Sequence, residues 1–167
     1  MKKIMIVDDE PDVVDFLAEV ITSDKNEAIK VYSGEECLKS VQIMKPDLIL
    51  LDILMEPVNG WEVLDKLKQN ESTKHIPVVI LTAKQLEIED AVKRARDISD
   101  YLTKPVDARE LKNVIEAVFD LDARMQRVLD QAKKMKISPQ AIAAIETKFI
   151  PTMRYYSTYF FNDTATT

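Results

Sequence analysis

The chain has 167 residues, of which 46% are hydrophobic and 31% are charged, and this is the composition of an ordinary globular protein. Its formal net charge of −6 argues against a nucleic-acid-binding surface that covers the whole molecule. Cys37 is the only cysteine, which excludes a disulfide framework and a zinc site built of several thiolates. No signal peptide precedes the first apolar run, and no run reaches the roughly 18 residues that span a bilayer. We therefore expect a cytoplasmic protein without a membrane partner.

Five short apolar runs alternate with amphipathic stretches of helical length. Short runs of aliphatic residues are typical of buried parallel strands, whereas apolar residues three and four apart predict helices. The predicted strands cover about residues 3–8, 28–32, 48–52, 78–82 and 101–104. The predicted helices cover about residues 11–24, 33–45, 61–69 and 86–96, and the last one begins at Asp107. Two of these helices start with the spacing of a capping box, at Ser33 with Glu36 and at Asp107 with Glu110.

This alternation predicts the fold class. Strands that alternate with helices form a parallel sheet with right-handed crossovers and with helices on both faces. We expect an α/β fold, namely a doubly wound, five-stranded parallel sheet in the flavodoxin-like order 2-1-3-4-5. In such a sheet the carboxyl ends of the strands meet at one edge, and ligands bind there.

Polar residues follow four of the predicted strands at this edge. They are Asp8 and Asp9 at the carboxyl end of the first strand, Asp52 at that of the third, Thr82 at that of the fourth and Lys104 at that of the fifth. Taken singly, each has an ordinary interpretation as a helix cap, a strand residue or a surface lysine. Together they bring three carboxylates, one hydroxyl and one amine to one place, where the carboxylates would repel one another without a cation. A divalent metal ion and a phosphoryl group would satisfy every member of this set.

The helix that begins at Asp107 continues past the end of a five-helix domain. Its apolar residues recur three and four apart in a heptad-like stripe, at Leu111, Val114, Val118, Leu121, Met125, Val128, Ala132 and Met135. Ser138 and Pro139 open a further predicted helix, and an aromatic tail at residues 155–161 precedes an end that we expect to be disordered. We therefore divide the chain into a domain at residues 1–120 and a helical extension at residues 121–167.

The stripe beyond Val118 needs a cover that the sheet does not supply. We expect a homodimer that forms through the long C-terminal helix, and a helical hairpin with the helix after Ser138 is the alternative. Residues 1–107 carry a net charge of −8 and residues 108–167 a net charge of +2. The extension is too weakly basic to predict direct nucleic-acid binding.

The residues at the sheet edge resemble the receiver domain of two-component response regulators over about residues 1–120. Each matching element is weak alone, but the five-point pattern is specific in combination. The flanking residues Met55, Gly60, Ala83 and Tyr101 also resemble this family. The resemblance implies a signalling switch rather than an enzyme with a separate substrate. It also implies a sensor histidine kinase or a phosphotransfer protein as the partner that supplies the phosphoryl group.

The resemblance assigns the acceptor and the metal ligands. Asp52 would be the phosphoacceptor. Asp9 and Asp52 would bind Mg²⁺ directly, together with the backbone carbonyl of Leu54, and Asp8 would act mainly through a metal-bound water. The chemistry agrees, because Mg²⁺ prefers octahedral oxygen ligands from one or two carboxylates with waters completing the shell.

The resemblance also assigns the residues around the phosphoryl group. Lys104 would pair with its oxygens, the Thr82 hydroxyl would bind another oxygen, and Tyr101 would turn inward when Thr82 moves. We further expect the Lys104–Pro105 peptide bond to be cis, since X-Pro bonds are the ones in which cis is accessible. One departure is the loop at residues 55–57, which reads Met-Glu-Pro where the family often has Met-Pro.

Two alternative functions remain less favoured. A phosphatase of the haloacid-dehalogenase type also uses an Asp nucleophile, a Lys and Mg²⁺. Such an enzyme places its nucleophile first in the chain and usually carries an acid two residues later, where this chain has Leu54. A scaffold that keeps the receiver fold without phosphorylation would lack part of the acidic site, and no part is missing here.

Overall fold

The computed structural model describes residues 1–83, 94 and 97–134, with side chains as far as Leu121. Its strands are β1 (Lys2–Val7), β2 (Asn26–Val31), β3 (Leu48–Asp52), β4 (Val78–Thr82) and β5 (Asp100–Thr103). Its helices are α1 (Pro11–Ile21), α2 (Gly34–Met44), α3 (Gly60–Gln69) and α5 (Ala108–Lys134). The helix predicted at residues 86–96 lies outside the described residues except for Arg94.

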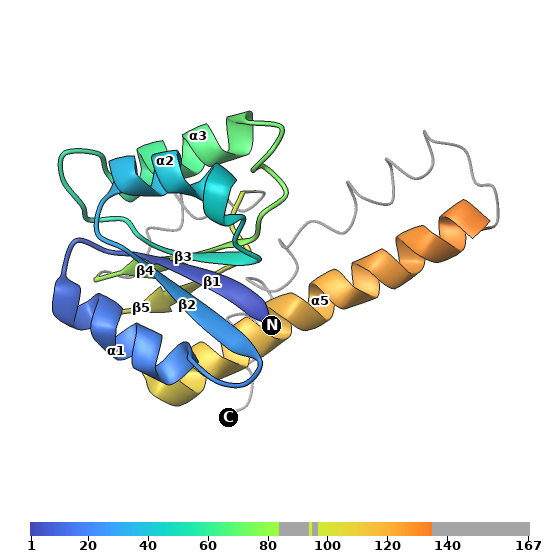
Figure 1. Ribbon diagram of the computed structural model, residues 1–167, viewed down its shortest axis with the longest axis horizontal. Helices are drawn as coiled ribbons and strands as arrows, with labels where there is room; N and C mark the ends of the chain where they lie inside the picture. Colours follow the sequence, from blue (N-terminus) through green and yellow to red (C-terminus); the bar gives the residue numbers. More distant parts are fainter. Residues whose placement is uncertain (84–93, 95–96, 135–167) are drawn as a thin grey trace, which may run out of the picture.

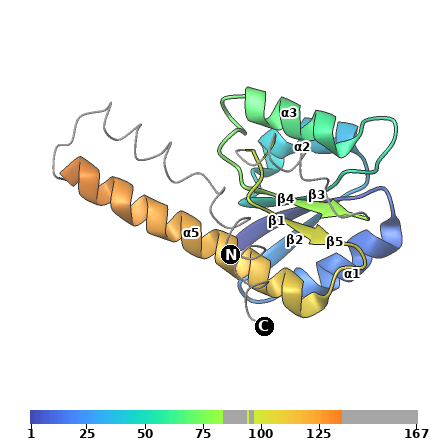
Figure 2. The same ribbon diagram turned by 180° about the vertical axis from the view of Figure 1, so that it is seen from behind.

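The strands form one parallel sheet in the order β2-β1-β3-β4-β5, which confirms the predicted fold class and strand order. Helices α1 and α5 cover one face of this sheet, and α2 and α3 cover the other (Figures 1 and 2). The central strands β3 and β4 are buried along their whole length. This explains their uninterrupted apolar runs, because a strand covered on both faces has no solvent-facing side.

Successive residues of each strand enter opposite halves of the core. On β1, Met5 and Val7 pack in the cluster with α2 and α3, whereas Ile4 and Ile6 pack in the cluster with α1 and α5. This alternation follows from the period of two of a β-strand. The sheet is thus held between two layers of helices, and the carboxyl ends of its strands lie at one edge.

The helix starts agree in part with the predicted capping boxes. The Ser33 hydroxyl accepts a hydrogen bond from the Glu36 N–H at 3.2 Å, as expected. The Glu36 carboxylate, however, accepts from the N–H of Tyr32 at 2.9 Å, one residue before the predicted partner. Asp107 Oδ1 accepts from the N–H of Glu110 at 3.0 Å, so the first turn of α5 is capped.

Helix α5 runs far beyond the domain. Its first turns bury Leu111, Ile115 and Val118 against the sheet. The rest of the helix, as far as Lys134, projects past the edge of the sheet at which β1 begins (Figure 1). The predicted helix after Ser138 and the aromatic tail lie outside the described residues. Of the described helices, none is long and apolar enough to cross a bilayer.

Gly60 allows the loop after β3 to fold back against the strand. Its N–H donates a hydrogen bond to the Ile53 carbonyl oxygen at 3.0 Å. A Cβ atom at this position would lie 2.1 Å from the Asp52 carbonyl oxygen and 2.7 Å from the Ile53 Cα atom. Both neighbours are backbone atoms, so they cannot move aside as a flexible side chain could. Glycine is therefore required here by close approach of the chain to itself.

We expect Gly60→Ala to lower the free energy of unfolding by about 1–3 kcal/mol or more, the usual cost of forcing extra atoms into a packed site. Urea unfolding followed by circular dichroism measures this loss. Lys66→Ala on the exposed side of the same helix is the matched control and should change stability little. A Gly60→Ala protein as stable as the control would show that the loop relaxes without loss.

Candidate functional site at the carboxyl edge of the sheet

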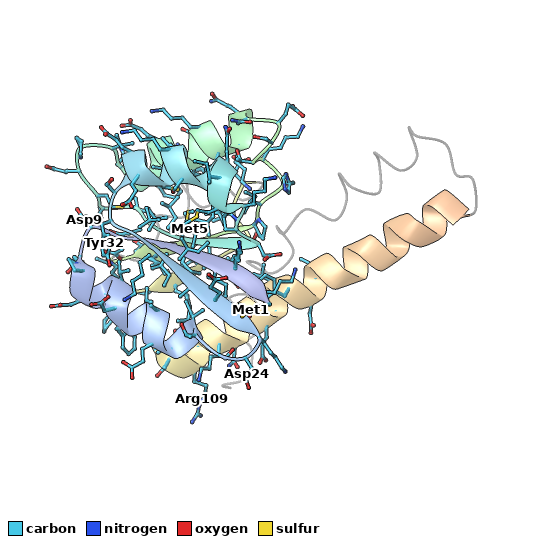
Figure 3. The ribbon with its side chains drawn as sticks, in the orientation of Figure 1. Met1, Met5, Asp9, Asp24, Tyr32 and Arg109 are labelled. Carbon is cyan, nitrogen blue, oxygen red and sulfur yellow. The ribbon has the colours of Figure 1, made fainter. Side chains whose placement is uncertain are left out.

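Three aspartates meet at the carboxyl edge of the central strands. Asp8 and Asp9 follow β1, and Asp52 ends the neighbouring strand β3. Each offers a carboxylate oxygen, and these oxygens lie within 4.8 Å of one another. Asp8 and Asp52 are buried, whereas Asp9 is exposed. Met1 and Asp9 lie at the two opposite ends of β1 (Figure 3). The structure thus brings together the acidic residues that the sequence placed at this edge.

Lys104 reaches into the same cluster from the end of β5. Its Nζ atom lies 2.7 Å from Asp8 Oδ2 and 3.4 Å from Asp52 Oδ2, and the side chain is only 14% exposed. The Lys104–Pro105 peptide bond is cis, which confirms the prediction, and the Glu56–Pro57 bond is cis as well. Burial alone would lower the pKa of Lys104, but the surrounding carboxylates outweigh burial and raise it. Lys104 is therefore an ammonium ion at neutral pH.

The surroundings of Lys104 favour its charged form, whereas those of Asp52 disfavour its charged form. Burial raises the pKa of this carboxyl group, and the nearby negative charge of Asp8 raises it further. The positive charge of Lys104 and a hydrogen bond from the Leu54 backbone act against this rise without cancelling it. One ammonium group thus compensates the aspartates incompletely, and a further cation would relieve the remaining repulsion.

The Asp8 carboxylate also favours a further cation. Asp8 Oδ2 is fully buried, and of the described residues none gives it a hydrogen bond of acceptable geometry. Its close polar contact is the ion pair with Lys104 Nζ at 2.7 Å. A buried polar atom without a hydrogen-bond partner is rare in folded proteins. Three converging carboxylates, two of them buried, fit a hard divalent cation such as Mg²⁺.

Thr82, Tyr101 and Leu54 are the other residues that the resemblance assigns to the site. Thr82 is buried at the end of β4, and its carbonyl oxygen accepts a hydrogen bond from the Lys104 N–H at 2.7 Å. Tyr101 is half-buried on β5, two residues before the end of that strand, and packs on the edge of the core. The Leu54 side chain is 61% exposed. These positions suit the predicted roles of the three residues, which stay predictions.

Glu10 is a member of the site that the sequence pattern did not single out. Its Oε1 atom accepts a hydrogen bond from Lys104 Nζ at 3.1 Å. The only signal in the sequence is that it directly follows Asp8 and Asp9. An acidic residue at the start of a helix is commonly explained by its favourable interaction with the helix N-terminus. The sequence therefore gave no reason to expect that Glu10 contacts the distant Lys104.

The same family emerges from comparison with known sequences. Residues 4–116 match the family described as the response regulator receiver domain. Protein PilH of Pseudomonas aeruginosa is 34% identical over 119 residues, which cover 71% of this chain and 98% of PilH. The alkaline phosphatase synthesis transcriptional regulatory protein PhoP of Bacillus subtilis is 31% identical over 161 residues. That alignment covers 95% of this chain but 64% of PhoP, so this chain spans less than two thirds of that relative.

Solved structures agree. The N-terminal domain of a response regulator receiver protein from Methanoculleus marisnigri JR1 is 42% identical, with a TM-score of 0.61. The similarity covers 71% of this chain and 96% of that domain. Since the sequence match extends over most of the chain and the strand order and acidic edge are those expected, the chain belongs to the response regulator receiver domain family.

Proposed function

We propose that the protein accepts a phosphoryl group on Asp52 from a sensor histidine kinase or a phosphotransfer protein. The observation that carries this proposal is the buried Asp52 carboxylate, which shares an edge of the sheet with two further carboxylates and the Lys104 ammonium. An Asp52 oxygen attacks the phosphorus of a phosphohistidine, the P–N bond breaks, and the imidazole leaves with the bonding electron pair. The product is an acyl phosphate on Asp52. Such a transfer needs positioning and charge neutralisation more than covalent chemistry by other residues.

The surrounding residues supply these two requirements. Asp9, Asp52 and the Leu54 carbonyl would hold Mg²⁺, with Asp8 acting mainly through water. The metal ion, when bound, neutralises charge on the phosphoryl oxygens. Lys104 would pair with one of these oxygens, and the position of its Nζ atom 3.4 Å from Asp52 Oδ2 supports this role.

The switch uses strands β4 and β5, which lie on the other side of β3 from β1. The Thr82 hydroxyl binds a phosphoryl oxygen, and Tyr101 turns inward when Thr82 moves. Support comes from the hydrogen-bonded adjacency of β4 and β5, which pairs Thr82 with Thr103 and Ile80 with Tyr101. The protein is a switch that catalyses only its own phosphorylation and dephosphorylation, and it changes partner binding or oligomeric state. The extension carries too little positive charge to support direct nucleic-acid binding.

Incubation with acetyl phosphate and Mg²⁺, followed by intact mass spectrometry, tests the proposal. We expect one added phosphoryl group that is lost on treatment with hydroxylamine, since hydroxylamine cleaves acyl phosphates. Chelation of the metal ion should prevent the modification. No added mass under conditions that modify another receiver domain would refute the proposed function.

We also propose that the chain forms a homodimer through α5. The helix leaves the domain after Val118 and continues to Lys134 without a neighbouring element among the described residues (Figure 2). The apolar stripe of the sequence continues along this part of the helix. Burying each large apolar side chain is worth roughly 1.5–3 kcal/mol, so a second copy of the same stripe is a favourable cover.

Sedimentation of the full chain and of a chain that ends at Asp120 tests the dimer. We expect a concentration-dependent dimer for the full chain and a monomer for the truncated chain. The truncation keeps Leu111, Ile115 and Val118, which pack on the sheet, so the domain should stay folded. If the full chain is monomeric at every concentration, the dimer is refuted and the hairpin alternative takes its place.

A further inference from the structure

Glu10 is the third carboxylate at the Lys104 ammonium, and the proposed phosphoryl transfer does not use it. Lys104 Nζ donates a hydrogen bond to Glu10 Oε1 at 3.1 Å. The same nitrogen atom lies 2.7 Å from Asp8 Oδ2 and 3.4 Å from Asp52 Oδ2. In the unphosphorylated protein, the group that should bind the phosphoryl oxygens is therefore surrounded by carboxylates.

The backbone explains why the Glu10 side chain is available for this contact. Glu10 is the N-cap of α1, and its carbonyl oxygen accepts hydrogen bonds from the N–H groups of Val13 and Val14 at 3.1 Å each. Its own N–H donates to Asp8 Oδ1 at 3.0 Å. Side chains at the N-cap commonly close the first helical turn, but the Glu10 side chain makes no such hydrogen bond. The backbone is thus held by α1 and Asp8, while the carboxylate extends to Lys104.

Glu10 differs from the other two carboxylates in burial. The Glu10 side chain is 65% exposed, whereas those of Asp8 and Asp52 are 0% and 3% exposed. Separating a buried carboxylate from its cation leaves an uncompensated charge in the protein, which is strongly unfavourable. An exposed carboxylate instead exchanges its ion pair for water with little change in free energy. Glu10 is therefore the partner that Lys104 releases most readily when another anion arrives.

We propose that Glu10 is a positioning residue that holds Lys104 in the unphosphorylated protein and competes with the phosphoryl oxygens for its ammonium group. The inference rests on the proposed role of Lys104 in binding the phosphoryl group. Removal of the Glu10 charge leaves Lys104 with one anionic partner fewer, so that its ammonium group is more available. The rate of phosphorylation and the affinity for a phosphoryl analogue should then rise together.

Glu10→Gln in the full chain tests the proposal. We expect the rate of phosphorylation by acetyl phosphate with Mg²⁺, followed by intact mass, to rise about two- to fivefold, the ratio that corresponds to one exposed ion pair. The affinity for beryllofluoride, an analogue of the phosphoryl group, should rise by a similar factor in a fluorescence titration of Trp61. Glu19→Gln removes the same charge from an exposed site further along α1 and should change neither quantity.

A double-mutant cycle separates competition for Lys104 from simple repulsion of the anionic donor. In a Lys104→Met background, Glu10→Gln should give no gain in rate. An equal gain in both backgrounds, an equal gain in Glu19→Gln, or no gain in Glu10→Gln while the wild-type protein is phosphorylated would overturn the inference. If the wild-type protein takes up no phosphoryl group, the proposed function fails, and this inference fails with it.

Discussion

Asp52→Asn should abolish phosphorylation of the protein, with no modified species above background after incubation with acetyl phosphate and Mg²⁺. The amide nitrogen and oxygen of Asn are poor nucleophiles, and the variant keeps the shape of the buried side chain. Because Asp52 is buried and close to Asp8, the substitution also removes one of two charges that repel each other. The variant is therefore expected to fold, and circular dichroism checks this.

The expected loss is specific to one acid among many. Asp12 lies exposed in the first turn of α1, close in sequence to the acidic cluster, and Asp12→Asn is the matched control. We expect wild-type phosphorylation in this control. Peptide mapping after reduction of the acyl phosphate with borohydride locates the modified residue. Modification of Asp52→Asn to the wild-type level would contradict the assignment of Asp52 as the sole acceptor.

Asp9→Ala should reduce the rate of phosphorylation by roughly 10²–10³-fold, the loss that follows removal of one preorganised electrostatic group from an enzyme active site. Asp9 is the exposed member of the three aspartates, so its removal leaves the buried pair and Lys104 in place. The effect should therefore appear in metal binding and rate rather than in stability. Equal unfolding free energies of the variant and the wild type, measured in urea without metal, check this.

Trp61 reports on the same site. It directly follows Gly60, whose backbone lies against that of Asp52, so its fluorescence should respond when a cation binds at the acidic cluster. We expect weak Mg²⁺ binding in the wild type, because few carboxylates leave most of the metal shell to water. We expect no saturable response in Asp9→Ala. A wild-type response and rate in this variant would show that Asp9 is not a ligand.

The sequence by itself determines the order of the elements and the edge at which they present their polar residues. The uninterrupted apolar runs of β3 and β4 can be read from adjacent residues alone. They indicate strands buried on both faces, because such strands have no polar side. The acidic pair follows the apolar run of β1 and Asp52 ends that of β3, so the parallel arrangement places them together. For Gly60, the sequence offered only the resemblance to the family and no physical reason for a glycine at that position.

Other features depend on distances between segments far apart in the chain, and the tertiary structure alone decides them. The contact of Lys104 with Glu10 joins residues 94 positions apart, and nothing in the local pattern of either one predicts it. The requirement for Gly60 arises because the chain folds back onto the Asp52 backbone. The course of α5 away from the sheet likewise follows from where its first turns pack, with Leu111 and Val118 in the core. Local periodicity specifies which face of an element is apolar, but only packing specifies what that face meets.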